Sequence, residues 1–140
     1  MADTTVKVSD GSFAAYVSAP KGRPSAPGIL VIQEIFGVNK VMRDLCDDLA
    51  GQGYLAMCPD LFWRQEPGIQ ITDKTEAEWK RAFELFQGFN QDKGAQDLIA
   101  SLAHLRKLPG CSGKAGSVGY CLGGKLAYLM ATRSDSDCNV

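Results

Sequence analysis

A cysteine set among glycines is the residue pattern in this sequence with the clearest capacity for chemistry. Residues 119–124 read Gly-Tyr-Cys-Leu-Gly-Gly, between a segment that predicts a strand (115–120) and one that predicts a helix (122–132). This is the pattern of a nucleophile elbow, with cysteine in place of the more usual serine. The sharp turn pushes the nucleophile out over a sheet, and residues two positions to either side must be small so that neighbouring backbone can pass. We therefore predict that Cys121 is a nucleophile; a buried structural cysteine is the alternative.

The helix predicted after Cys121 would assist this chemistry. A helix N-terminus favours a thiolate over a thiol, and it offers the backbone N–H of Leu122 to an oxyanion that forms on a carbonyl substrate. The glycine spacing does not match the GxGxxG pattern of a dinucleotide-binding loop. An acyl-transfer site is therefore favoured over a nucleotide site.

The elements before the cysteine predict an α/β fold. Residues 4–9 and 13–18 alternate around Asp10-Gly11, which predicts an antiparallel hairpin. The unbroken apolar run 29–32 predicts a strand that is buried on both faces, as in a parallel sheet. An apolar helical face over 42–49 and a short strand over 54–58 complete a right-handed βαβ unit.

Two further helices are predicted after a long loop over 59–73. The first carries three aromatic residues at helical spacing, and the second carries aliphatic residues on one face: Trp79, Phe83 and Phe86, then Ala95, Leu98, Ile99, Leu102 and Leu105. Together these segments predict a mostly parallel sheet with an N-terminal antiparallel hairpin.

Composition excludes several classes of function. Fifteen basic and sixteen acidic residues are scattered along the chain, so no basic surface for nucleic acid is expected. No apolar run approaches the roughly 20 residues of a membrane span, and the start lacks the pattern of a signal peptide, so we expect a cytoplasmic protein. Five cysteines form no CxxC pair and only one histidine is present, which favours reduced thiols, no metal and no cofactor.

Five blocks of this sequence resemble the dienelactone hydrolase family of α/β-hydrolases, in the family's order and spacing. They are Gln33-Glu34-Ile35-Phe36-Gly37-Val38-Asn39, Met42-Arg43, Gly53-Tyr54, Cys58-Pro59-Asp60-Leu61 and residues 119–124. The resemblance implies hydrolysis of an enol-lactone or related small ester through a thioester acyl-enzyme. It also implies a Cys-Asp-His triad whose acid and histidine follow the nucleophile.

The resemblance assigns roles to two residues of the first block. Glu34 matches a glutamate that contacts the nucleophile and helps to generate the thiolate when substrate binds, because a carboxylate beside a thiol opposes its ionisation until it moves. Its alternative is a solvated or helix-capping carboxylate. Ile35 matches the second backbone N–H of the oxyanion hole, beside that of Leu122.

The expected substrate pocket is aromatic, formed by Phe36, Phe62, Trp79 and Phe83. Trp79 stands where members of the family carry an arginine that binds the substrate carboxylate. Arg81 lies two residues on, about 200° around a helix, and does not replace that arginine. The exact substrate therefore stays open, and the candidates include substrates other than the standard dienelactone. Ordinary core packing is the alternative for these aromatics, and we expect it for at least two of Phe62, Phe83 and Phe86.

The acid and base of the triad are missing from the residues after Cys121. Residues 122–140 contain no histidine, and Asp135 and Asp137 fall at the far end of the elbow helix. His104, the single histidine, is predicted to point into solvent. We expect residues 1–140 to be one incomplete α/β-hydrolase domain, truncated after the elbow helix.

An incomplete sheet would expose the strand that ends at Tyr120 as an unpaired edge. Residues 138–140 could begin another strand there. The edge would otherwise be covered by a missing C-terminal portion, present as a separate piece, or by another copy. Two other functions stay open from the sequence. One is a non-catalytic fragment that binds a partner through this edge, and the other is a redox-responsive thiol protein with Cys121 as the thiol.

Overall fold

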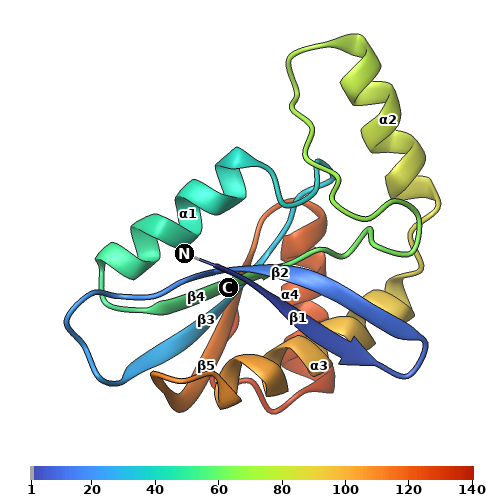
Figure 1. The fold of residues 1–140 in the computed structure, drawn as a ribbon. Coiled ribbons are helices and arrows are strands. Elements are labelled where there is room, and N and C mark those ends of the chain that lie inside the picture. Colours follow the sequence, from blue (N-terminus) through green and yellow to red (C-terminus); the bar gives the residue numbers. More distant parts are fainter. Residues whose placement is uncertain (1) are drawn as a thin grey trace.

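The computed structural model describes residues 2–140 as a five-stranded mixed sheet with helices on both faces (Figure 1). Helix α1 covers one face, and helices α3 and α4 cover the other. The elements in chain order are β1 (Ala2–Val8), β2 (Gly11–Ser18), β3 (Ala26–Ile32), α1 (Lys40–Gly51), β4 (Leu55–Pro59), α2 (Glu76–Gln87), α3 (Gln91–Lys107), β5 (Cys111–Gly119) and α4 (Leu122–Arg133).

The strands lie in the order β1-β2-β4-β3-β5, and their pairing confirms the predicted N-terminal hairpin and the predicted α/β fold. Strands β1 and β2 form the antiparallel hairpin, in which Val8 pairs with Gly11 across the turn. Strand β2 joins β4 antiparallel, and β4, β3 and β5 run parallel to one another. The carboxyl ends of β3, β4 and β5 therefore meet at one edge of the sheet.

Strand β3 shows why an unbroken apolar run suits a central strand. Leu30 and Ile32 pack in the core beneath α3 and α4, whereas Val31 packs in the core beneath α1, and all three are fully buried. Because successive side chains point to opposite faces, a strand covered on both sides has no polar face.

Helix α1 buries Met42 and Cys46 as predicted, and its N-cap Asn39 accepts a hydrogen bond from the Met42 N–H (3.2 Å). Helix α3 buries the predicted aliphatic face except at Ile99, whose exposed fraction is 38%. The prediction for Ile99 was wrong because this residue lies 100° around the helix from its buried neighbour Leu98.

The chain itself covers part of the free edge of β5. Ser117 donates its N–H to the Cys138 carbonyl (2.9 Å), and Val140 donates to the Ser117 carbonyl (2.9 Å). A parallel bridge joins Ser117 and Asn139. The prediction of a strand beginning at 138–140 is thus confirmed as a short paired segment, and the prediction of an unpaired edge was wrong at this position. Among residues 2–140, no helix is long and apolar enough to cross a membrane.

Candidate active site

Cys121 occupies the strained turn that an elbow requires. Its backbone has φ 57° and ψ −119°, and within residues 2–140 it is the one non-glycine residue with a positive φ. Such a conformation costs about 1–3 kcal/mol and is retained where the surrounding structure enforces it. The Cys121 side chain is exposed. The turn therefore presents the thiol to solvent at the end of β5.

The glycines around Cys121 are required by backbone contacts. A Cβ atom on Gly119 would lie 1.9 Å from the carbonyl oxygen of Gly123, and one on Gly123 would lie 2.3 Å from the carbonyl oxygen of Ile32. At Gly124, the nearest atom to such a Cβ is 3.5 Å away. The sequence predicts small residues at positions 119 and 123, and these are the two positions that have no room for a side chain. They hold α4 directly against the end of β3.

The first turn of α4 leaves a hydrogen-bond donor beside the thiol. Gly123 donates to the Tyr120 carbonyl (2.8 Å) and Gly124 to the Cys121 carbonyl (3.0 Å), whereas the Leu122 N–H donates no hydrogen bond within residues 2–140. The free N–H groups of a helix N-terminus carry partial positive charge. This donor is suited to an oxyanion.

A second donor lies in the loop after β3. The Ile35 N–H also makes no hydrogen bond to any part of the chain that the structure describes. Glu34 is half-buried, and its carboxylate forms no hydrogen bond or ion pair within the same residues. A capping role for Glu34 is therefore not seen, because the cap of α1 is Asn39.

Gln33, which the sequence analysis quoted but gave no role, holds this loop in place. It is fully buried; its Nε2 donates to the Glu34 carbonyl (3.1 Å), and its Oε1 accepts from the Leu61 N–H (2.9 Å). One side chain therefore joins the loops after β3 and β4. The signal in the sequence is a neutral amide side chain placed directly after a buried apolar strand.

Asp60, directly after β4, shapes the neighbouring loop. Its carboxylate accepts from the N–H groups of Phe62 (3.1 Å) and Gly68 (2.8 Å). Burial raises the pKa of this carboxyl group, partly offset by those two hydrogen bonds.

The parallel strands bring the predicted catalytic residues to one end of the sheet. Figure 1 shows the turn between β5 and α4, the loop after β3 and the long loop that leads to α2 gathered there. Crevices outside the carboxyl ends of parallel strands are the usual ligand sites of such sheets. Cys121 and Leu122 thus share an edge with Glu34 and Ile35.

Three of the four predicted pocket aromatics form one cluster. The rings of Phe36 and Trp79 meet edge to face at 5.2 Å between centroids, and those of Trp79 and Phe83 lie 5.6 Å apart. The Trp79 indole N–H donates to the Asp73 carbonyl (2.8 Å). Beside the cluster is a hollow of about 350 Å³, whose lining includes Glu34 and Phe36.

Phe62 lies elsewhere, and the expectation that at least two of Phe62, Phe83 and Phe86 pack in the core was wrong, because only Phe62 does. Phe62 is 1% exposed and packs against Phe89 at 5.8 Å. Phe83 and Phe86 are 49% and 45% exposed, and the buried residues of α2 are instead Ala82 and Leu85.

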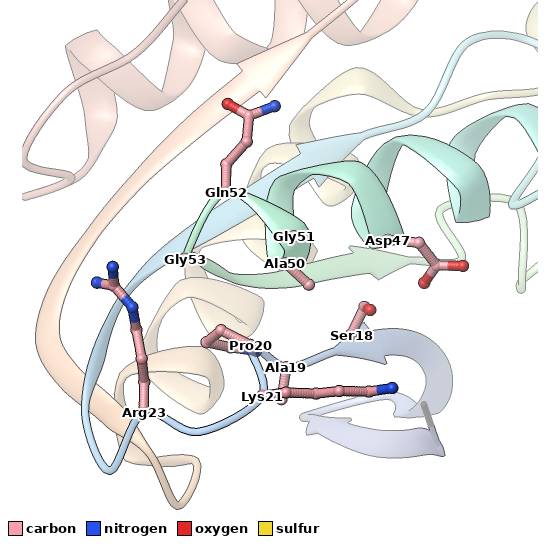
Figure 2. Close-up of a pocket in the computed structure, with 10 residues that line it drawn as sticks. All are labelled: Ser18, Ala19, Pro20, Lys21, Arg23, Asp47, Ala50, Gly51, Gln52 and Gly53. Carbon is pink, nitrogen blue, oxygen red and sulfur yellow. The ribbon is translucent and has the colours of Figure 1, made fainter.

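A larger hollow lies away from this edge. It measures about 650 Å³ and lies where β3 and β4 begin, against the end of α1 (Figure 2). Its lining carries Lys21, Arg23 and Asp47 but no cysteine or histidine. Its position, at the amino ends of the parallel strands, separates it from Cys121.

His104 is held at the opposite edge of the sheet from Cys121. Its Nε2 lies 2.9 Å from the Thr4 hydroxyl on β1, whereas Cys121 follows β5 at the other edge. The ring is half-buried, so the prediction of a solvated histidine was wrong. Asp135 and Asp137 lie at the far end of α4 as expected, where both bond Arg106. A backbone hydrogen bond from Ala115 lowers the pKa of Asp137.

A largely parallel sheet, covered by helices on both faces and followed by a strained turn at Cys121, is the architecture of the α/β-hydrolases. The crystal structure of a provisionally named dienelactone hydrolase from Klebsiella pneumoniae has a TM-score of 0.79 and 28% identity to the chain, covering 95% of this chain and 54% of that one. The chain belongs to the dienelactone hydrolase family, whose sequence model matches residues 13–139.

Curated relatives point to the same family. The chain is 58% identical over 135 residues to a provisionally named carboxymethylenebutenolidase of Azospirillum brasilense, covering 94% of this chain and 56% of the relative. It is 44% identical over 126 residues to the carboxymethylenebutenolidase of Pseudomonas putida, covering 90% and 53%. The chain therefore spans about half the length of the curated relatives it matches.

Proposed function

We propose that the whole protein hydrolyses an enol-lactone or a related carboxylic ester, with Cys121 as the nucleophile. The observation that carries this proposal is the backbone of Cys121, because a positive φ at a non-glycine residue with an exposed thiol serves no packing purpose. Membership of the dienelactone hydrolase family and the names of the relatives support the reaction class.

The proposed reaction begins with attack of the Cys121 thiolate on the carbonyl carbon of the ester. The carbonyl oxygen becomes an oxyanion, which accepts hydrogen bonds from the N–H groups of Leu122 and Ile35. The C–O bond then breaks, the alcohol or enol oxygen leaves with the electron pair, and a thioester to Cys121 forms. Water hydrolyses this thioester, which releases the acid and restores the thiol.

Glu34 is proposed to control when the thiolate forms. A carboxylate close to a thiol raises the pKa of that thiol by like-charge repulsion, so movement of Glu34 on substrate binding would favour ionisation. The support is that Glu34 is half-buried at the same edge and has no ion pair within residues 2–140.

The base that activates the hydrolytic water is proposed to come from outside these 140 residues, because His104 is held by Thr4 on β1. The chain alone is then expected to complete the acylation step and to stop at the thioester.

Acylation of the chain by p-nitrophenyl acetate tests this proposal. We expect a burst of one p-nitrophenolate per chain and an acetyl group on the peptide that contains Cys121, detected by mass spectrometry. Cys138 is the matched control, because it is also an exposed free cysteine. Cys121→Ala should abolish the burst and Cys138→Ala should retain it.

Two outcomes would contradict the proposal. Equal acetylation of Cys121 and Cys138 would show that the turn confers no special reactivity. Fast alkylation of Cys121 by iodoacetamide without acetylation by the ester would instead support the redox-responsive thiol.

A further inference from the structure

We infer that Trp79 determines the class of substrate: the group attached to the reacting carbonyl is neutral, planar and apolar, and it stacks on the exposed indole. This inference rests on the proposed function, since it concerns the group next to the carbonyl that Cys121 attacks.

The loop that carries the Ile35 N–H is fastened to the loop that precedes α2. The Phe36 carbonyl accepts from the Ile71 N–H (3.1 Å), and Gly37 forms an antiparallel bridge with Gln70. A Cβ atom at Gly37, which has φ 79°, would lie 2.0 Å from the Ile69 carbonyl oxygen. The two loops therefore form one unit in which backbone contacts backbone.

Trp79 is bonded to this same unit. Its indole N–H donates to the Asp73 carbonyl, two residues after Ile71, and its ring packs edge to face on Phe36. Phe36 follows Ile35 directly in the chain. The Trp79 ring is therefore joined, through Phe36 and Asp73, to the loop that carries the Ile35 N–H.

The surface presented to substrate is the indole itself. Phe36 is only 8% exposed, whereas Trp79 is 39% exposed and Phe83, next to it, is 49% exposed. The polar atom of the indole is already used by Asp73. What remains is aromatic surface, which favours stacking of a flat apolar group.

The charges near the cluster do not favour an anionic substrate. The charged residues that line the adjoining hollow are three acids (Glu34, Asp44 and Asp73) and two bases (Lys40 and Lys74). Lys40 is paired with Asp44, and Arg81 on α2 is paired with Glu66 and Glu84. Lys74 is the one base in the lining of this hollow that forms no ion pair within residues 2–140.

The test compares acylation of the 140-residue chain by three p-nitrophenyl esters. The acyl groups are acetyl, phenylacetyl and hemisuccinyl, which are small, aromatic and carboxylate-bearing. Each burst rate is divided by the rate of the same ester with N-acetylcysteine, which removes differences in intrinsic reactivity. We expect phenylacetyl to be preferred over acetyl by about tenfold, the size of a stacking interaction.

Variants then assign the preference. Trp79→Ala should reduce the phenylacetyl-to-acetyl ratio about tenfold, and Trp79→Phe should keep it within about twofold, because a smaller ring still stacks. Phe86→Ala is the matched control: Phe86 is also an exposed aromatic of α2, and it should leave the ratio unchanged.

An unchanged ratio in Trp79→Ala would overturn the inference. So would fastest acylation by the hemisuccinyl ester with loss of that advantage in Lys74→Ala, which would identify a carboxylate site. Failure of the proposed function looks different, because Cys121 would then be acylated by none of the three esters.

Discussion

The turn that carries Cys121 and the helix that carries Trp79 lie at the same end of the sheet, but different kinds of contact hold them. Around Cys121, backbone packs on backbone: the Gly123 Cα faces the carbonyl oxygens of Ile32 and Gln33 with no space for a methyl group. Helix α2 projects from the body of the molecule (Figure 1) and is joined to it by side chains, through buried Ala82 and Leu85 and the bond from Trp79 to Asp73.

In the proposed function, this difference separates the residues proposed to perform the chemistry from the residue proposed to select the substrate. Moving the elbow requires moving β3, β5 and α4 together, whereas the exposed side chains of α2 lie outside the packed core. We therefore expect substitutions at the elbow to change the stability of the whole chain, and substitutions in α2 to act locally.

The largest effect is expected for Gly123→Ala. The added methyl group would meet the Ile32 carbonyl oxygen at 2.3 Å, and a backbone atom of a central strand cannot move aside. We expect loss of about 3 kcal/mol or more in the free energy of unfolding, measured by urea denaturation. Gly124→Ala is the matched control, because it has room for a methyl group and alanine favours the helix. Equal losses in the two variants would show that the contact at Gly123 is not tight.

Replacing Cys121 by glycine should stabilise the chain. Glycine adopts φ 57° without a steric penalty, so we expect a gain of about 1 kcal/mol in the free energy of unfolding. Cys121→Ala, which removes the thiol and retains the Cβ, should show little of this gain. If alanine and glycine gave the same stability, the strain at the turn would be absent.

A smaller and local effect is expected from Thr75→Ala at the start of α2. The Thr75 hydroxyl caps this helix by accepting from the Glu78 N–H (3.2 Å), a contact worth about 1 kcal/mol. Amide hydrogen exchange should become faster in α2 and stay the same in α4. Faster exchange in both helices would mean that α2 and the elbow unfold together, which would contradict the comparison.

The smallest effect is a pH dependence of α2. Hydrogen bonds from the Thr72 N–H and hydroxyl, and from Thr75, lower the pKa of Glu78 below its ordinary 4.5. A lowered pKa means that these bonds stabilise the fold fully above about pH 4.5 and lose their effect as the pH falls through the lower value. The NMR signal of the Trp79 indole N–H should shift over that range, and Glu78→Gln should remove the shift. A titration that Glu78→Gln leaves intact would point to another group.

The elbow could be predicted from the sequence because its requirements are local. The cysteine, the two glycine positions with no room for a Cβ atom, and the adjacent strand and helix are close together in the sequence, and each has a characteristic residue type. The hairpin and the buried strand β3 could also be predicted, from Asp10-Gly11 and from the unbroken apolar run 29–32.

The orientation of α2 could not be predicted, because burial of a helix face depends on what packs against it. Trp79, Phe83 and Phe86 have the spacing of a core stripe, yet all three are exposed, and the buried positions of α2 are Ala82 and Leu85. The environment of His104 could not be predicted either, because its partner Thr4 is 100 residues away in the sequence. Neither feature leaves a trace in local spacing.

The amide group of Gln33 fits its site at the carboxyl ends of the parallel strands in only one orientation. A side-chain amide has one donor end and one acceptor end, and here each faces its complement, the Glu34 carbonyl and the Leu61 N–H. Turning the amide round would set acceptor against acceptor and donor against donor in a fully buried position. A glutamate of the same shape would match Leu61 but repel the Glu34 carbonyl. The position of the loop that carries Ile35 therefore depends on which end of the Gln33 amide is the nitrogen and which is the oxygen.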